Sequence, residues 1–90
     1  MLYKLYIGSN NKTKKLEEKK AVEIATKQFE GFTAYKGLGY WQGKKEKCLI
    51  LEIETKKEKD IIYLAKTLAK KLNQEAVGLA RIGKMSFIAV

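Results

Sequence analysis

The stretch FTAYKGLGYWQGKKEKCLILEIE, Phe32 to Glu54, decides the fold of this chain. Two β-rich runs, FTAYKGLGYW and EKCLILEIE, flank the link QGKK, and a glycine in so short a link is typical of a β-hairpin turn. Because side chains alternate between the two faces of a sheet, Leu49, Leu51 and Ile53 share one face. This is the most apolar set of the hairpin, so we predict that helices cover it.

The same alternation divides the first strand of the hairpin between a covered and an open face. Pairing Cys48 with either Gly37 or Gly39 gives the same division, because the two registers differ by an even step. Lys36 then falls on the covered face, where a bulge at either glycine would accommodate it. The predicted covered set is Phe32, Ala34, Lys36, Leu38 and Tyr40. The predicted open set is Thr33, Tyr35, Gly37, Gly39 and Trp41.

Two segments with helical periodicity lie on either side of the hairpin in the sequence. The first runs from Lys14 to Phe29, with Thr13 as the expected cap and Gly31 as the expected stop. The second starts at a capping box formed by Thr55 and Glu58, and Asn73 ends it. Each helix carries apolar residues at helical spacing that form one stripe. These stripes are Leu16, Ala21, Val22, Ala25 and Phe29 in the first, and Ile61, Leu64, Ala65, Leu68 and Leu72 in the second.

Two further strands complete the pattern. LYKLYI, Leu2 to Ile7, is the first strand of the chain, and EAVGLARI, Glu75 to Ile82, is the fourth. MSFIAV, residues 85–90, either extends the fourth strand or adds a short fifth. The order β-α-β-β-α-β predicts an α+β, ferredoxin-like fold, with a four-stranded antiparallel sheet and both helices on one face. Ninety residues suffice for one domain, so we expect a single domain over 1–90.

The open face of the predicted sheet is more apolar than a face in contact with water should be. It carries Tyr6, Tyr35, Trp41, Cys48 and Ile50, and such a patch usually marks an interaction surface. Three uses are open: self-association of two sheets, stacking of bases as in RNA-recognition domains, or a small-ligand pocket. The structural alternative is that the glycines serve twist and bulges while Trp41 packs on lysine stems.

In the pocket hypothesis, Tyr35 and Trp41 form the walls, and the bare backbone at Gly37 and Gly39 lets a ligand approach closely. A second candidate site is GSNNKTKK, which leaves a strand and opens a helix. Free backbone N–H groups at a helix start favour anions, and Ser9, Asn10, Asn11 and Lys12 add donors or charge there. The simpler interpretation of this segment is a loop with a capping threonine.

Composition restricts the chemistry. The net charge is +9, which favours an anionic partner. Eighteen of the nineteen basic residues are lysines, with Arg81 as the exception, and this scarcity of arginine argues against recognition of specific bases. The chain has no histidine, which excludes Ser-His and Cys-His nucleophile pairs and histidine-ligated metals. We therefore expect no catalysis, no cofactor and no metal. The lone Cys48, the lack of a long apolar run and the lack of a signal peptide predict a cytoplasmic protein without membrane contact.

Several stretches together carry a family resemblance: KLYIGSNN, FEGFTAYKGLGYWQGKKE, LILEI and LNQEAVG. The chain resembles a group of small, largely uncharacterised ferredoxin-like proteins of bacteria and their phages, with a glycine–aromatic hairpin. The resemblance spans most of the chain and implies the ferredoxin-like fold. It also implies a phage or mobile-element origin, in which case the protein would act in the host cytoplasm on a host factor or a signal nucleotide. It assigns no functional residue.

The leading functional expectation is a non-enzymatic, homo-oligomeric protein that captures an anionic ligand, of which a nucleotide signal is one example. Tyr35 and Trp41 would stack on the ligand, while Lys12, Lys44 and Lys45 would contact its phosphates. One alternative is a basic module that binds nucleic acid, with an affinity that falls as salt is added. Another is an adaptor or inhibitor that masks a host protein through the open face.

Overall fold

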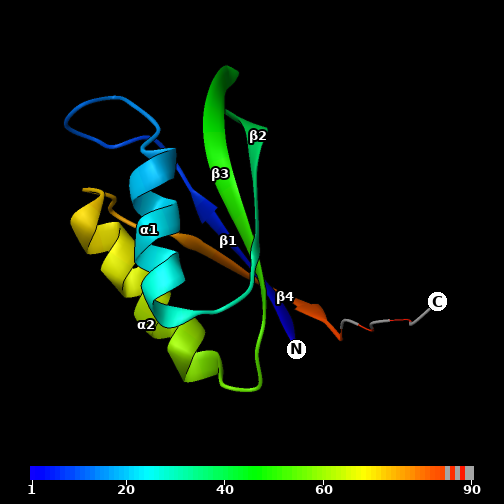
Figure 1. Ribbon diagram of the computed structural model, residues 1–90. Helices are drawn as coiled ribbons and strands as arrows, with labels where there is room; N and C mark the ends of the chain where they lie inside the picture. The colour runs from blue at the N-terminus through cyan, green and yellow to red at the C-terminus, as the bar shows by residue number, and fades with distance from the viewer. Residues whose placement is uncertain (85, 87, 89–90) are drawn as a thin grey trace.

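The computed structural model describes residues 1–84, 86 and 88, and it contains two helices and four strands (Figure 1). Both helices lie on the same side of one sheet, and the other side of the sheet is open (Figure 1). The elements in chain order are β1 (Leu2–Ile7), α1 (Glu18–Gln28), β2 (Thr33–Trp41), β3 (Lys44–Glu54), α2 (Glu58–Lys71) and β4 (Gly78–Gly83).

The sheet has the order β2-β3-β1-β4, and every neighbouring pair is antiparallel. Each helix therefore joins two strands that run in the same direction, with a strand of the other half inserted between them, which is a pair of split β-α-β units. The predicted α+β class, the element order and the placement of both helices on one face are confirmed. The expected extension of the fourth strand, or short fifth strand, over 85–90 falls mostly on residues outside those described, which are 85, 87, 89 and 90.

The core lies between the helices and the two central strands, as the alternation predicts. Leu5 and Ile7 of β1, with Leu49, Leu51 and Ile53 of β3, are buried against both helices. Each such side chain contributes about 1.5–3 kcal/mol through burial. The helices supply the remaining buried contacts from one face each: Ala21, Ala25, Ile61, Leu64, Leu68 and, just after α2, Leu72.

The hairpin turn is shorter than the link QGKK that the sequence suggested. Gln42 and Gly43 alone form it, with φ of 50° and 77°, and Trp41 pairs directly with Lys44. Positive φ at both central residues matches the type I′ turn, whose twist suits an antiparallel pair. Lys44 and Lys45 therefore begin β3 instead of lying in the turn. The pairing continues without a bulge from one end of the hairpin to the other, with Gly37 opposite Cys48, which is one of the two predicted registers.

Both helices begin later than predicted. α1 starts at Glu18 rather than Lys14, because Lys14 has φ of 63° and breaks the helical path. The Thr13 hydroxyl accepts a hydrogen bond from the Lys15 backbone N–H at 3.3 Å instead of capping the helix. α2 starts at Glu58, and Thr55 accepts from Lys57 N–H at 3.3 Å, so the predicted capping box is wrong.

The predicted end of α2 is confirmed, and the predicted end of α1 is wrong. Asn73 has φ of 53° and follows the end of α2, as predicted. α1 already ends at Gln28, and the chain leaves through Phe29 in an extended conformation, so Gly31 does not serve as the predicted stop. The fourth strand begins at Gly78 rather than Glu75, and its register with β1 shifts between Leu2 and Tyr3.

Candidate anion-binding site

The two helices cover only part of the sheet, and the hairpin formed by the end of β2, the turn and the start of β3 extends beyond them (Figure 1). This segment comprises residues 36–48. We call this segment the projecting hairpin. Leu38 and Tyr40 lie on the sheet face that continues into the core, but they are 58% and 70% exposed. Ala34 is exposed as well. The predicted face is therefore right for these three β2 side chains, since they share it with Leu49 and Leu51. The expected cover is wrong, because β2 is an edge strand and no helix lies over them.

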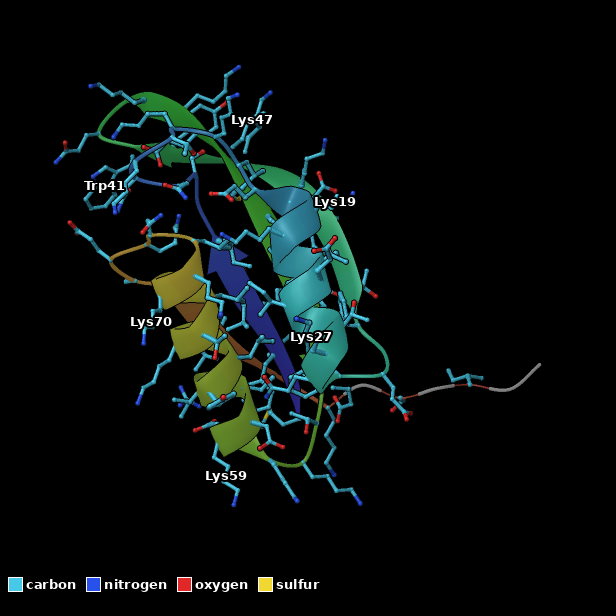
Figure 2. All side chains as sticks on the ribbon, turned by 60° about the vertical axis from the view of Figure 1, so that its left-hand side comes forward. Lys19, Lys27, Trp41, Lys47, Lys59 and Lys70 are labelled. Carbon is cyan, nitrogen blue, oxygen red and sulfur yellow. The ribbon has the colours of Figure 1, made fainter. Side chains whose placement is uncertain are left out.

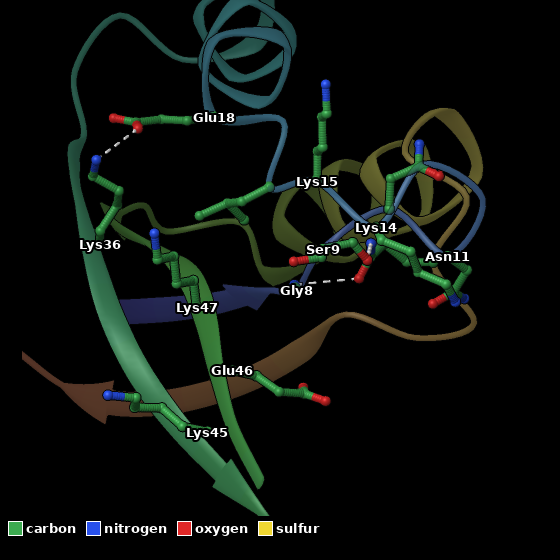
Figure 3. Close-up of a pocket in the computed structure, with 13 residues that line it drawn as sticks. Gly8, Ser9, Asn11, Lys14, Lys15, Glu18, Lys36, Lys45, Glu46 and Lys47 are labelled. Atoms are coloured by element: carbon green, nitrogen blue, oxygen red, sulfur yellow. Dashed lines mark hydrogen bonds and ion pairs between the residues drawn. The ribbon is translucent and has the colours of Figure 1, made fainter.

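A groove of about 750 Å³ lies between the projecting hairpin and the loop of residues 8–16. We call it the lysine groove. Figure 3 shows Lys36 and Lys47 of the hairpin with Glu18 on one side of it, and Ser9, Asn11 and Lys14 on the other. Its size lies within the range of small-molecule sites, roughly 300–1,000 Å³. The basic residues that line it are Lys14, Lys15, Lys36, Lys45 and Lys47, and the acidic ones are Glu18 and Glu46.

Asn10 holds the loop of the groove in shape. Asn10 is only 3% exposed, and its side-chain oxygen accepts hydrogen bonds from the backbone N–H groups of Lys12 at 2.8 Å and Thr13 at 3.2 Å. Its side-chain nitrogen donates to Glu17. An asparagine that bonds the backbone two and three residues on is a common turn-forming device. Asn10 therefore acts on the loop, and its polar atoms are occupied there.

The end of α2 fixes the same loop from the other side. The Gln74 side-chain oxygen accepts from Gly8 N–H at 3.2 Å, and its nitrogen donates to the Ser9 carbonyl at 2.6 Å. The Asn11 N–H donates to the Asn73 carbonyl at 3.3 Å. Residues more than sixty positions apart thus hold one wall of the lysine groove. A wall fixed in this way keeps its lysines near the hairpin without a ligand, which reduces the entropy cost of binding.

The charge in the groove is unbalanced. Lys36 forms an ion pair with Glu18 at 3.6 Å, and both side chains are largely exposed, so the pair is weak. Among the residues that the structure describes, Lys14, Lys15, Lys45 and Lys47 form no ion pair. Five cations face two carboxylates, and their mutual repulsion creates a positive potential that a multivalent anion would relieve.

The open sheet face is more polar than the sequence indicated. The Tyr35 hydroxyl donates to Glu52 Oε2 at 2.6 Å, and Lys4 Nζ lies 3.3 Å from the same oxygen. The hydrogen bond from Tyr35 holds the pKa of Glu52 below its usual 4.5, and it raises the pKa of Tyr35 above 10. Tyr35 is therefore tied to a neighbouring strand by its hydroxyl group.

Of the two glycines predicted to let a ligand approach, only Gly37 is covered by a side chain of the sheet, whereas at Gly39 the nearest atom to an added Cβ is the Glu46 carbonyl oxygen at 3.8 Å. A Cβ atom at Gly37 would lie 2.8 Å from Cδ1 of Ile50, so Ile50 already occupies the space above Gly37. Tyr6 lies over Gly78 in the same way, because a Cβ atom added at Gly78 would lie 3.3 Å from Cβ of Tyr6. Ile50 is only 8% exposed as a result. The backbone at Gly37 is thus not available for the close ligand approach that the sequence suggested.

The structure brings together some of the predicted site residues and separates others. Ser9, Asn10, Asn11 and Lys45 line the lysine groove, whereas Lys12 and Lys44 do not. Tyr35 and Trp41 lie on the open face, six residues apart on β2, which is roughly 20 Å, so they do not line one pocket. The same holds for the predicted interface set, whose members are spread along that face: Tyr6, Tyr35, Trp41, Cys48 and Ile50.

Four groove lysines escaped the sequence prediction: Lys14, Lys15, Lys36 and Lys47. A signal for two of them existed. Strand alternation places Lys36 and Lys47 on the apolar face of the hairpin, where a lysine has no reason to lie in a buried sheet. Lysines in such positions indicate where the cover of helices ends. Lys14 and Lys15 lie within GSNNKTKK, the second candidate site, but they were not named among its binding residues because the sequence placed them in the first turn of a helix.

Among residues 1–84, 86 and 88, no three histidine, cysteine, aspartate or glutamate side chains gather closely enough to hold a metal ion. Within the same part of the chain, no helix is long and apolar enough to cross a membrane. Comparison with protein-family models, with curated proteins and with solved structures finds no match for this chain. The assignment of the site therefore depends on its geometry and charge.

Proposed function

We propose that this protein binds a phosphate-bearing anion in the lysine groove and releases it chemically unchanged. The observation that carries the proposal is the convergence of five lysines, from the loop and from both strands of the hairpin, on one groove. Lysine ammonium groups are compact charges with three donors each, and they suit phosphate oxygens. Ser9 and Asn11 add neutral polar groups to the same wall.

Binding without catalysis follows from the residue types in the groove. Its titratable side chains are lysines and two glutamates, and Glu18 is paired with Lys36. General acid–base work at neutral pH needs a group whose pKa lies near 7, usually histidine or a strongly perturbed carboxylate. The chain has no histidine. We therefore favour a capture protein over an enzyme.

Thermal unfolding with inorganic tripolyphosphate tests the proposal. A ligand that binds only the native state stabilises it by about 2.7 kcal/mol at one hundred times its Kd. For a domain of this size, that raises Tm by roughly 10 °C or more. The increase should shrink steeply as salt is added, because the interaction is between charges. A Tm that does not respond to tripolyphosphate at low salt would overturn the proposal.

Charge reversal at matched positions separates a site from general basicity. Lys47→Glu changes an exposed groove lysine, and Lys59→Glu changes an exposed lysine at the far end of the molecule (Figure 2). Both variants change the net charge by the same amount. We expect Lys47→Glu to weaken tripolyphosphate binding about 10-fold or more, the value of one charge-assisted contact. Lys59→Glu should leave it almost unchanged, and equal losses would indicate non-specific attraction.

Self-association through the open face stays part of the proposal. Tyr6 is 42% exposed and Tyr35 37%, so two copies would bury rings that water now contacts. The same face carries Lys4 beside Glu52, which gives a two-fold copy both signs of charge to pair with. Native mass spectrometry reports the number of subunits and any retained ligand in one measurement. A monomer at micromolar concentration would contradict this part without affecting the groove.

A further inference from the structure

One aromatic ring lies on the same hairpin face as the groove lysines. Tyr40 pairs with Lys45 and Leu38 pairs with Lys47, and residues directly opposite each other in a sheet carry their side chains on the same face. Lys45 and Lys47 both line the lysine groove. Tyr40 does not itself line the groove, but it lies beside Lys45 on the same face, and 70% of its surface is exposed.

The turn decides which of two neighbouring aromatic residues has this position. The two-residue turn at Gln42 and Gly43 fixes Trp41 opposite Lys44, on the open face, and Tyr40 opposite Lys45. A register shift of one residue would exchange the faces of the two rings. The sequence favoured Trp41 as the stacking residue, whereas the register places Tyr40 beside Lys45, one of the groove lysines.

We propose that the ligand of the lysine groove is a nucleotide, whose base stacks on Tyr40 while its phosphates contact the lysines. This inference rests on the proposed function and names its ligand class. Tyrosine rings stack on nucleobases with little dependence on the base, because every base has a flat π-face. Lys36 lies four residues from Tyr40 along β2, roughly 13 Å, a span that the sugar and phosphates of one nucleotide cover.

The carboxylates of the groove favour a single nucleotide over a nucleic-acid strand. Glu18 lies at the start of α1 and lines the groove. Glu46 of β3 lines it as well, although its side chain leaves the strand on the face opposite to Lys45 and Lys47. A continuous phosphate backbone that crosses the groove would approach at least one of these negative charges. A mononucleotide instead ends at its terminal phosphate and can avoid them. The groove volume of about 750 Å³ also fits one nucleotide.

Calorimetric titration with ATP, GTP and inorganic tripolyphosphate tests the inference on four proteins: wild type, Tyr40→Ala, Tyr40→Phe and Trp41→Ala. Trp41 is the matched control, because it is the adjacent residue, is 69% exposed and lies on the opposite face. Stacking of one base should make ATP and GTP bind roughly 5- to 100-fold more tightly than tripolyphosphate. Tyr40→Ala should remove that advantage and leave tripolyphosphate binding unchanged. Tyr40→Phe and Trp41→Ala should both retain it.

The outcomes distinguish this inference from the proposed function. Equal affinity for ATP, GTP and tripolyphosphate, or a loss with Trp41→Ala but not with Tyr40→Ala, would overturn the inference and leave the anion site intact. No binding of any of the three would overturn both. If a short oligothymidylate binds more tightly than either nucleotide, the inference that the ligand is a mononucleotide would be overturned. The groove would then be assigned to single-stranded nucleic acid. Circular dichroism of each variant establishes that it is folded, which the exposure of both rings leads us to expect.

Discussion

Strand β3 passes through two different environments on a single sheet face. Leu49, Leu51 and Ile53 are fully buried under the helices, while Lys45 and Lys47, on the same face and nearer the turn, line the lysine groove. Nothing in the backbone changes between these two halves, since the pairing with β2 is continuous. The difference comes from the helices, which cover one half of the strand and end before the other. One alternation pattern thus builds the core in the covered half and the candidate site in the projecting half.

This comparison explains why apolar and basic residues follow each other so abruptly in the sequence. In the covered half, a side chain is selected for packing, and any change in volume is costly. In the projecting half, the same face meets water and a charged groove, so its residues contribute little to stability. Substitutions in the two halves should therefore have separable effects, on folding in one and on binding in the other.

The largest expected effect is on the core of the covered half. Leu51→Ala removes a fully buried side chain beneath both helices, and it should lower the free energy of unfolding by about 2–5 kcal/mol. Leu38→Ala removes the same atoms from a residue on the same face that is 58% exposed, and it should cost at most about 0.5 kcal/mol. Urea denaturation of both variants measures the contrast. Similar losses at the two positions would show that the projecting hairpin is covered after all.

The second effect concerns the loop that faces the projecting hairpin. Asn10→Ala removes the acceptor for two backbone N–H groups from a residue that is 3% exposed, and it should cost about 1–3 kcal/mol. Asn11→Ala, at an exposed neighbour in the same loop, is the control and should be nearly neutral. Thermal unfolding of the two variants checks this. If Asn10→Ala left both stability and tripolyphosphate binding unchanged, the loop would not depend on Asn10.

A third and smaller effect tests the turn of the projecting hairpin. Gly43 has φ of 77°, and alanine in the left-handed region is strained, so Gly43→Ala should destabilise the protein by about 1 kcal/mol. Gly31→Ala is the control, because no atom lies within 4 Å of the added methyl group and φ at Gly31 lies outside the left-handed region. Chemical denaturation compares the two. A neutral Gly43→Ala would argue against the type I′ turn and the register that places Tyr40 on the groove side.

The smallest effect is a pH dependence on the open face. The hydrogen bond from Tyr35 lowers the pKa of Glu52 in the folded state below 4.5, so its stabilising contribution is complete above 4.5. That contribution is lost as the pH falls through the lower folded-state pKa. The difference in stability between wild type and Tyr35→Phe should therefore be present at neutral pH and shrink in acid. Tyr6→Phe is the control, since Tyr6 has no carboxylate partner within the described part of the chain, and the same shrinkage there would contradict the assignment.

The fold was largely predictable from local patterns. The alternation of Leu49, Leu51 and Ile53 identified the core face of β3, and the helical stripes identified the two elements that cover it. Helix starts were less predictable: Thr55 and Glu58 have the spacing of a capping box, yet Glu58 forms a bidentate pair with Arg81 of β4. A partner far away in the sequence competes with a local cap, and sequence spacing alone does not reveal which interaction prevails.

The candidate site was predictable only in part. Ser9, Asn11 and Lys45 were named from their local chemistry, and they do line the groove. Their partners Lys36 and Lys47 were not named, because a lysine on an apolar strand face is informative only when the extent of the helices is known. Trp41 was preferred over Tyr40 as the stacking residue because its ring lies on the face that the sequence left open, whereas helices were expected over the face of Tyr40.

The sequence by itself determined the order of elements, the division of each central strand into two faces and the excess of lysine, because these depend on residue types at fixed local spacing. The tertiary structure alone decided where the helical cover ends. It also brought residues 8–16 beside residues 36–48, and it tied that loop to Asn73 and Gln74. Such proximity depends on helix length, strand length and packing together, and no short segment contains that information.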